Sequence, residues 1–339
     1  MYTPSFLIHR NAFRGETTLV YVKAKVHDKA ESTIVVRPLL EKMSKAELHT
    51  VMTNSFATLS GSTVAAYILY GVPANYLIAG SFMSAPAGLA LSKLAYPDDV
   101  TTLRSSRRHA LPDARETGFI EALVAGATAA IGVITHLVAN LIAFICILAF
   151  MNDAIIWFGA RVGLDLETVT FQVICSYVFW PFVFLMGVPM AECGVVARMV
   201  GIKILFSELL ALEDLGTLHK NRVTLERHLE GNGTFTWTDS GDIALSGTNV
   251  TLSGGVLTPR TETIATFALC GFSDVYAYCL LLAVLSAAAP SRKQDLVGVS
   301  GRAWICGIVA CFLSACMAGA VFSRQRIIPY ASGRLFMTH

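Results

Sequence analysis

The stretch AWICGIVACFLSACMAGAVF, residues 303–322, is twenty residues long and carries no charged side chain. A helix of about 20 apolar residues is long enough to cross the hydrocarbon core of a bilayer. Working outward from this stretch, the sequence predicts an all-α membrane protein with about six transmembrane spans. The other expected spans are residues 51–72, 76–94, 118–150, 195–212 and 264–287.

The overall composition supports a membrane protein. Hydrophobic residues make up 54% of the chain and charged residues 15%, against about 45–50% and about 25% in ordinary soluble domains. The formal net charge of +2 excludes a broad cationic surface for nucleic acid. There is no GxSxG, HExxH or Walker motif and no GxGxxG after a strand, so we expect neither an enzyme nor a resident cofactor.

Some apolar segments are interrupted. Pro181 and Gly187 interrupt residues 171–188, which suits a re-entrant hairpin better than a straight span. Interruptions recur around residues 55–62 and 181–208. Broken helices are tolerated in lipid only where their backbone is buried or lines a cavity. Paired breaks in the two halves of a chain indicate a transporter binding site, although channels and membrane enzymes show breaks too.

Residues 213–260 form the longest hydrophilic stretch. Two N-glycosylation sequons begin there, at Asn232 and Asn249. Residues 290–302 form a short charged loop with an excess of basic side chains, which is typical of the cytoplasmic side. We therefore expect loop 213–260 to be extracytoplasmic and glycosylated.

Two carboxylates lie inside apolar segments, where ionisable groups are costly and usually functional. Five residues separate Glu208 from Lys203, a poor helical spacing for an ion pair, so we expect Glu208 to bind a ligand. Asp274 closely follows Gly271, and two interpretations stay open. It is either a ligand-binding group or the N-cap of a helix that begins after a break.

Hydroxyl side chains cluster in one apolar segment, at Ser55, Thr58, Ser60, Ser62 and Thr63. Small residues of this kind let membrane helices pack closely. Alternatively, the helix is broken there, and its hydroxyl and carbonyl oxygens bind a hard cation such as sodium. The residues alone leave both interpretations open.

Ordered motifs from about Glu31 to Phe322 resemble the concentrative nucleoside transporter family, the sodium/nucleoside cotransporters. Because the matches are collinear, they are together far more specific than any one of them. The matching segments are residues 43–53, 56–62, 83–87, 93–94, 171–177, 184–188, 201–203, 268–272, 290–295 and 315–319.

The resemblance implies a scaffold and a moving transport domain with two re-entrant hairpins and two broken helices, related by an inverted repeat. It also implies a multi-pass plasma-membrane protein that forms a homotrimer. The expected division is a non-family segment 1–30, a hairpin remnant, broken helix and span 31–94, a charged loop 95–117, a scaffold helix 118–152, a second hairpin and broken helix 168–212, a hydrophilic loop 213–260, a transport-domain span 261–288 and a last span 303–322.

The resemblance further implies a nucleoside bound between the hairpin tips and the helix breaks. Glu31 aligns with a hairpin glutamate whose motif contacts the base. Glu208 aligns with a glutamate that binds the ribose, and Phe272 keeps the family's aromatic residue after the glycine. Asp274 stands where the family has a ribose-binding asparagine. The implied substrates are nucleosides of the uridine or adenosine class.

Sodium is the coupling ion that the resemblance implies, with no metal beyond it. Thr58 and Leu59 align with sodium-site positions, through a hydroxyl and a backbone oxygen. The sequence also departs from the family: residues 28–30 replace Gly-Gln-Thr, Ala277 replaces a hydroxyl residue, and Ser207 replaces an asparagine. The altered base-reading positions leave purine and pyrimidine preference open, and Asp274 leaves proton coupling open beside sodium.

Two hypotheses of different classes follow. The first is a sodium-coupled nucleoside symporter that works by alternating access. The second is a truncated, non-transporting membrane protein that assembles with full-length transporters and modulates them, which residues 1–30 favour because they do not resemble the family.

Overall fold

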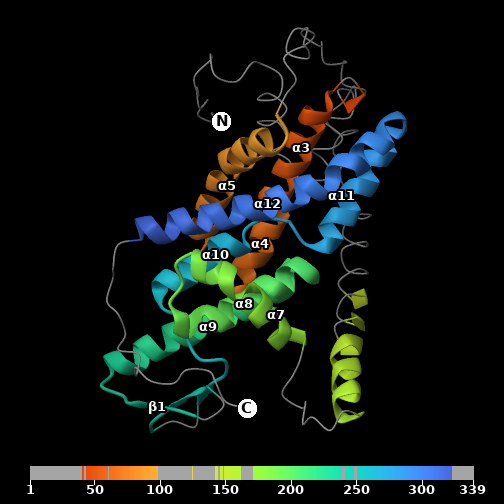
Figure 1. The fold of residues 1–339 in the computed structure, drawn as a ribbon. Coiled ribbons are helices and arrows are strands. Elements are labelled where there is room, and N and C mark those ends of the chain that lie inside the picture. The colour runs from red at the N-terminus through yellow and green to blue at the C-terminus, as the bar shows by residue number, and fades with distance from the viewer. Residues whose placement is uncertain are drawn as a thin grey trace.

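The computed structural model describes residues 40–41, 43–59, 61–97, 124, 142–143, 146–147, 149–161, 171–238, 241–247 and 250–322. In these ranges the protein consists mainly of helices, with one small sheet (Figure 1). The labelled helices are α3 (Lys45–Ala57), α4 (Gly61–Tyr70), α5 (Ala74–Ala95), α7 (Phe171–Leu185), α8 (Met190–Leu205), α9 (Glu208–Glu230), α10 (Pro259–Leu269), α11 (Val275–Ala288) and α12 (Lys293–Val321). The strands are β1 (Phe235–Trp237), β2 (Ile243–Leu245) and β3 (Thr251–Leu252).

Two described helices are long and apolar enough to cross a membrane, namely Ala74–Ala95 and Pro290–Val321. They contain the expected spans 76–94 and 303–322. The pair α7 and α8, bent by 118°, is a third candidate. The total of about six spans stays a prediction, because most of residues 118–148 lie outside the described ranges.

Three expected spans are interrupted helices. The segment 51–72 divides into α3, which ends at Ala57, and α4, which begins at Gly61. Residues 206–207 separate α8 from α9, and residues 270–274 separate α10 from α11. The break within 264–287 corrects the expectation of one continuous span there.

The turn expected inside residues 171–188 lies at the end of that segment. α7 continues through Pro181 to Leu185, and the chain then turns at Gly187, whose φ of +90° favours glycine. α8 packs closely against α7 after the turn. A Cβ atom at Gly201 would lie 2.4 Å from the Cβ of Cys175, so glycine is required for this approach.

The hydrophilic segment 213–260 is not a loop throughout. Its first part is the rest of α9, which buries Leu215, Leu218 and Leu225 along one face. An antiparallel sheet of order β1-β2-β3 follows, in which Phe235 pairs with Leu245. The sheet lies beyond the far end of α9, away from α3 and α5 (Figure 1). Leucines at helical spacing thus stabilise a segment whose average composition predicted a loop.

Residues 290–302 are also helical rather than a loop. A short 3-10 helix covers Pro290–Arg292, and α12 begins at Lys293. Asp295, in the first turn of α12, forms ion pairs with Lys45 and with Arg292, each at 2.9 Å. Hydrogen bonding to Asp295 raises the pKa of Lys45. Compensated charges therefore allow the helix to extend beyond its apolar part.

The described residues 149–161 are helical. The expected scaffold helix 118–152 therefore does not end at residue 152. The charged loop 95–117 falls almost wholly outside the described residues, as do residues 1–30.

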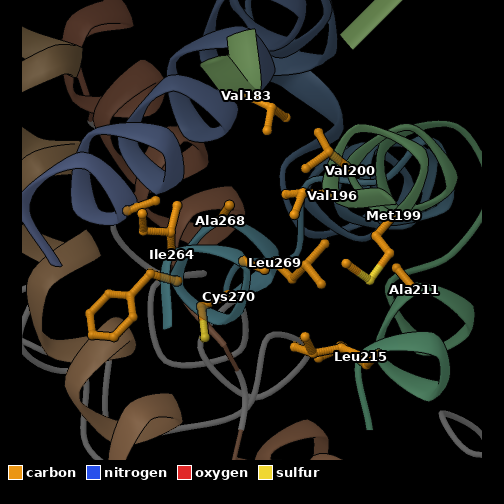
Figure 2. Packing of buried hydrophobic residues seen from close by; sticks show 14 of the residues in the cluster. Val183, Val196, Met199, Val200, Ala211, Leu215, Ile264, Ala268, Leu269 and Cys270 are labelled. Carbon is orange, nitrogen blue, oxygen red and sulfur yellow. The ribbon is translucent and has the colours of Figure 1, made fainter. Parts of the chain in front are cut away.

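α12 crosses the molecule and packs against α3, α5 and α10 (Figure 1). A Cβ atom at Gly307 would lie 2.4 Å from the Cβ of Phe56, so α12 and α3 touch closely. The main core lies where α8, α9 and α10 meet, and Figure 2 shows its side chains gathered around Leu269. Those labelled there include Val196, Met199 and Val200 of α8, Ala211 and Leu215 of α9, and Ile264, Ala268 and Cys270 of α10 with its cap.

Candidate functional site

Two of the helix breaks touch each other. Gly271, in the break between α10 and α11, has φ +138° and packs against the end of α3. A Cβ atom there would lie 3.2 Å from the carbonyl oxygens of both Phe56 and Ala57, and 2.3 Å from Cys311 Sγ. Any residue with a side chain would push these segments apart, so the glycine brings the two breaks together.

Glu208 is the first residue of α9 and is 2% exposed. Ser207 caps this helix, because its Oγ accepts a hydrogen bond of 3.2 Å from Leu209 N. A carboxylate in the first turn of a helix is stabilised by the unpaired backbone N–H groups and the helix dipole. The structure therefore places Glu208 at a helix break inside the protein, as the sequence predicted.

Lys203 lies in the last turn of α8 and is 1% exposed. Its Nζ donates a hydrogen bond of 3.0 Å to the carbonyl oxygen of Ala268, in the last turn of α10. The last carbonyls of a helix lack partners within that helix and carry partial negative charge. One ammonium group thus stabilises the ends of α8 and α10. Its pairing with a carbonyl agrees with the expectation that Lys203 is no ion-pair partner for Glu208 at this spacing.

Asp274 is the N-cap of α11, since its Oδ1 accepts a hydrogen bond of 2.6 Å from Ala277 N. The capping interpretation is therefore confirmed, and a ligand-binding role stays a prediction. Phe272, in the same break, packs edge-on against Tyr276 with ring centroids 6.3 Å apart. Trp304 of α12 donates to Ser273 O at 2.8 Å, which fixes the break against α12.

Tyr67 of α4 is a member of the site that the sequence analysis missed. Its side chain is fully buried, and its hydroxyl lies beside Glu208, with Cys270 and Asp274 also near. A tyrosine in an apolar helix gives no sequence signal of this kind, because most such residues simply fill the core. We call Tyr67, Lys203, Glu208, Cys270 and Asp274 the central cluster.

The expected sodium-site residues lie at the C-terminal end of α3. Thr58 is its C-cap, and the Thr58 hydroxyl donates a hydrogen bond of 2.8 Å to Asn54 O. Leu59 follows in the break. The break leaves backbone carbonyls of the last turn without helical partners, which is the oxygen chemistry that sodium takes. Among the described residues no group of three or more His, Cys, Asp or Glu side chains is placed to hold a metal ion.

Three other predicted residues fall elsewhere. Glu31 and Asn249 lie outside the described residues. Asn232 is exposed and follows the end of α9, with φ +57°. Its exposure fits a glycan acceptor, whose modification stays a prediction.

A second charged group, which the sequence analysis also missed, lies between α9 and α10. Glu262 is 3% exposed, and its Oε2 accepts a hydrogen bond of 2.6 Å from Arg222 Nε. Its Oε1 pairs with His219 Nδ1, and Arg222 also reaches Glu226 at 2.8 Å. We call these four residues the peripheral cluster. They were missed because Arg222 and His219 lie 40 and 43 residues from Glu262 in the sequence.

Interrupted apolar helices that meet at breaks with buried charges are the arrangement typical of helical membrane transporters. Residues 76–319 match the family described as "Na+ dependent nucleoside transporter C-terminus". The chain therefore belongs to this family, which consists of transporters rather than enzymes.

Curated relatives and solved structures agree with the family. The chain is 39% identical over 294 residues to sodium/nucleoside cotransporter 1 of Oryctolagus cuniculus, and 38% identical over 295 residues to solute carrier family 28 member 3 of Homo sapiens. Each match covers 86% of this chain but only 41% and 39% of the relatives. The structure of CNTnw in an inward-facing substrate-bound state is 28% identical with a TM-score of 0.69, covering 89% of this chain and 64% of that one.

Proposed function

We propose that this chain provides the substrate site of a sodium-coupled nucleoside symporter that works by alternating access. The observation that carries the proposal is Glu208, a carboxylate buried at a helix break in a family of sodium-dependent nucleoside transporters. Buried ionisable groups in membrane segments mark substrate and ion pathways. The transmembrane potential would contribute about 2.3 kcal/mol per sodium ion per 100 mV.

In this proposal Glu208 accepts hydrogen bonds from the ribose hydroxyls. An ionised carboxylate offers only acceptor sites, which suits the adjacent 2′ and 3′ hydroxyl donors of a ribose. Phe272 lines the same region, and Asp274 contributes its second carboxylate oxygen while its first caps α11. Glu31 completes the site from the first hairpin, and uridine or adenosine is the substrate class.

Sodium binds at the break after α3 in this proposal. Thr58 contributes its hydroxyl oxygen, which keeps free lone pairs while its proton goes to Asn54 O. Leu59 contributes its backbone carbonyl. Gly271 places the α10–α11 break against this position, so that sodium binding at one break would organise the nucleoside site at the other.

The setting of the proposed transporter is the plasma membrane. The helices Ala74–Ala95 and Pro290–Val321 support a multi-pass chain in the bilayer. The inverted repeat, the homotrimer and the glycans at Asn232 and Asn249 complete the proposal. The alternative, a non-transporting modulator, gains no support from the relatives, which are named as transporters.

The test is uptake of radiolabelled uridine and adenosine into cells that express the chain, in sodium and with choline replacing it. We expect sodium-dependent uptake, and its loss by at least about 100-fold in Glu208→Gln, because the neutral amide is a weaker acceptor and presents a misplaced donor. Glu213→Gln is the matched control, because Glu213 is exposed on the same helix. Equal uptake by Glu208→Gln, or no uptake by any variant at normal surface expression, would contradict the proposal.

A further inference from the structure

Tyr67 has the largest side chain among the fully buried residues of the described chain. It lies on α4, one turn before that helix ends at Tyr70. A fully buried tyrosine normally finds a hydrogen-bond partner for its hydroxyl, because a buried polar group without one loses its hydration. Its environment therefore needs a physical explanation.

The Tyr67 hydroxyl makes no conventional hydrogen bond within the described part of the chain. It nevertheless lies beside the Glu208 carboxylate, with the polar groups of Cys270 and Asp274 nearby. These neighbours come from three elements other than α4: the start of α9, the end of α10 and the start of α11. The buried hydroxyl thus has two carboxylates, those of Glu208 and Asp274, among its neighbours.

Close packing fixes the end of α4 against α9. A Cβ atom at Gly216 of α9 would lie 2.4 Å from the Tyr70 carbonyl oxygen, so the backbones of α4 and α9 touch. Gly71, with φ +98°, ends α4, and Val72 N then donates to the Tyr67 carbonyl oxygen at 3.1 Å. These contacts fix the backbone of the last turn of α4, which carries Tyr67.

We propose that Tyr67 is a positioning residue that orients the Glu208 carboxylate toward the sugar hydroxyls of the nucleoside. This inference rests on the proposed function. The Tyr67 hydroxyl donates to one carboxylate oxygen when the site closes on its ligand and leaves the other oxygen to the sugar.

The experiment measures binding of uridine and 2′,3′-dideoxyuridine, which lacks the 2′ and 3′ hydroxyls, to the purified full chain in lipid nanodiscs with sodium. The quantity of interest is the affinity ratio of the two ligands. In Tyr67→Phe we expect uridine to bind about tenfold more weakly, in line with the loss of one hydrogen bond to a charged group, while dideoxyuridine binding stays unchanged. The ratio therefore falls about tenfold. Tyr70→Phe, one turn away on α4, is the matched control and keeps the wild-type ratio.

If Tyr67 had a purely structural role, Tyr67→Phe would weaken the binding of both ligands equally and leave the affinity ratio unchanged. That result would overturn this inference but not the proposed function. In a Glu208→Gln background, Tyr67→Phe should have no further effect on the ratio, since the two residues act as a unit. If Tyr67→Phe does not fold, 3-fluorotyrosine at position 67, a stronger donor, should raise the ratio, and an unchanged ratio would again overturn the inference. Failure of the wild-type chain to bind uridine at all would instead overturn the proposed function, and this inference with it.

Discussion

The central and peripheral clusters each hold a buried carboxylate at a helix junction, Glu208 and Glu262, but the two carboxylates have different partners. In the peripheral cluster both carboxylate oxygens of Glu262 pair with basic side chains, Arg222 and His219. In the central cluster the cation, Lys203, donates to a backbone carbonyl. The side chain beside Glu208 is the neutral Tyr67.

This difference separates a structural charge from a functional one. A carboxylate with two basic partners has little capacity left for a ligand, and removing either partner leaves an uncompensated charge. A carboxylate at a helix N-terminus beside a neutral hydroxyl keeps its negative charge and can accept hydrogen bonds from a ligand that brings its own donors. The comparison predicts that substitutions in the peripheral cluster change stability, and that those in the central cluster change binding.

The largest effect on stability is expected from Arg222→Met. It leaves Glu262 buried without its guanidinium partner, so the free energy of unfolding should fall by about 3–5 kcal/mol. Uridine affinity of the folded fraction should stay unchanged. Denaturation in detergent, followed by near-UV circular dichroism, measures the stability. Arg198→Met is the control, because Arg198 pairs with Asp214 at 3.7 Å on the partly exposed surface and should cost less than about 1 kcal/mol. An equal loss in the free energy of unfolding in the two variants would contradict the structural role given to the peripheral cluster.

An intermediate effect is expected from Lys203→Met. The substitution removes a charged hydrogen bond to Ala268 O, which contributes about 1.5–3 kcal/mol. Because Lys203 is also the cation of the central cluster, uridine affinity should fall together with stability. The same denaturation series, combined with uridine binding, checks both outcomes. The exposed Lys293→Met serves as the control, and a Lys203→Met protein with wild-type uridine affinity would show that the lysine acts only on the helix ends.

The smallest effect is expected at Asp274, where capping and ligand binding can be separated. Asp274→Ala removes the hydrogen bond to Ala277 N and should reduce stability by about 1 kcal/mol, whereas Asp274→Asn should keep the cap. Thermal denaturation distinguishes the two variants. Uptake by Asp274→Asn then tests coupling to protons: an unchanged pH dependence would rule out Asp274 as a coupling group.

The sequence predicted the parts of this protein that depend on local pattern. The apolar spans now seen as α5 and α12, the interruptions near residues 58 and 187, and the isolated Glu208 all follow from composition along the chain. The extent of α9 and the start of α12 were not predicted. Their charged turns are stabilised by partners distant in sequence, such as Lys45 for Asp295.

The candidate site was predictable only in part, for the same reason. A carboxylate in an apolar segment is visible in the sequence, so Glu208 and Asp274 were found. Tyr67 and Glu262 were not, because their significance comes from the neighbours that folding brings to them. A break within residues 264–287 was one of two interpretations open at Gly271 and Asp274, and only the packing against Phe56 and Ala57 shows why that glycine is needed.

Arg260 restricts which parts of the molecule can move separately. From the start of α10, its Nε donates to Gly319 O at 3.0 Å and its Nη1 to Gly187 O at 2.6 Å. One side chain thus joins α10, the end of α12 and the turn between α7 and α8 into a single mechanical unit. In an alternating-access cycle, some parts of the protein move and others stay in place. If these three elements moved separately, both hydrogen bonds would have to break, so we expect the three elements to move together.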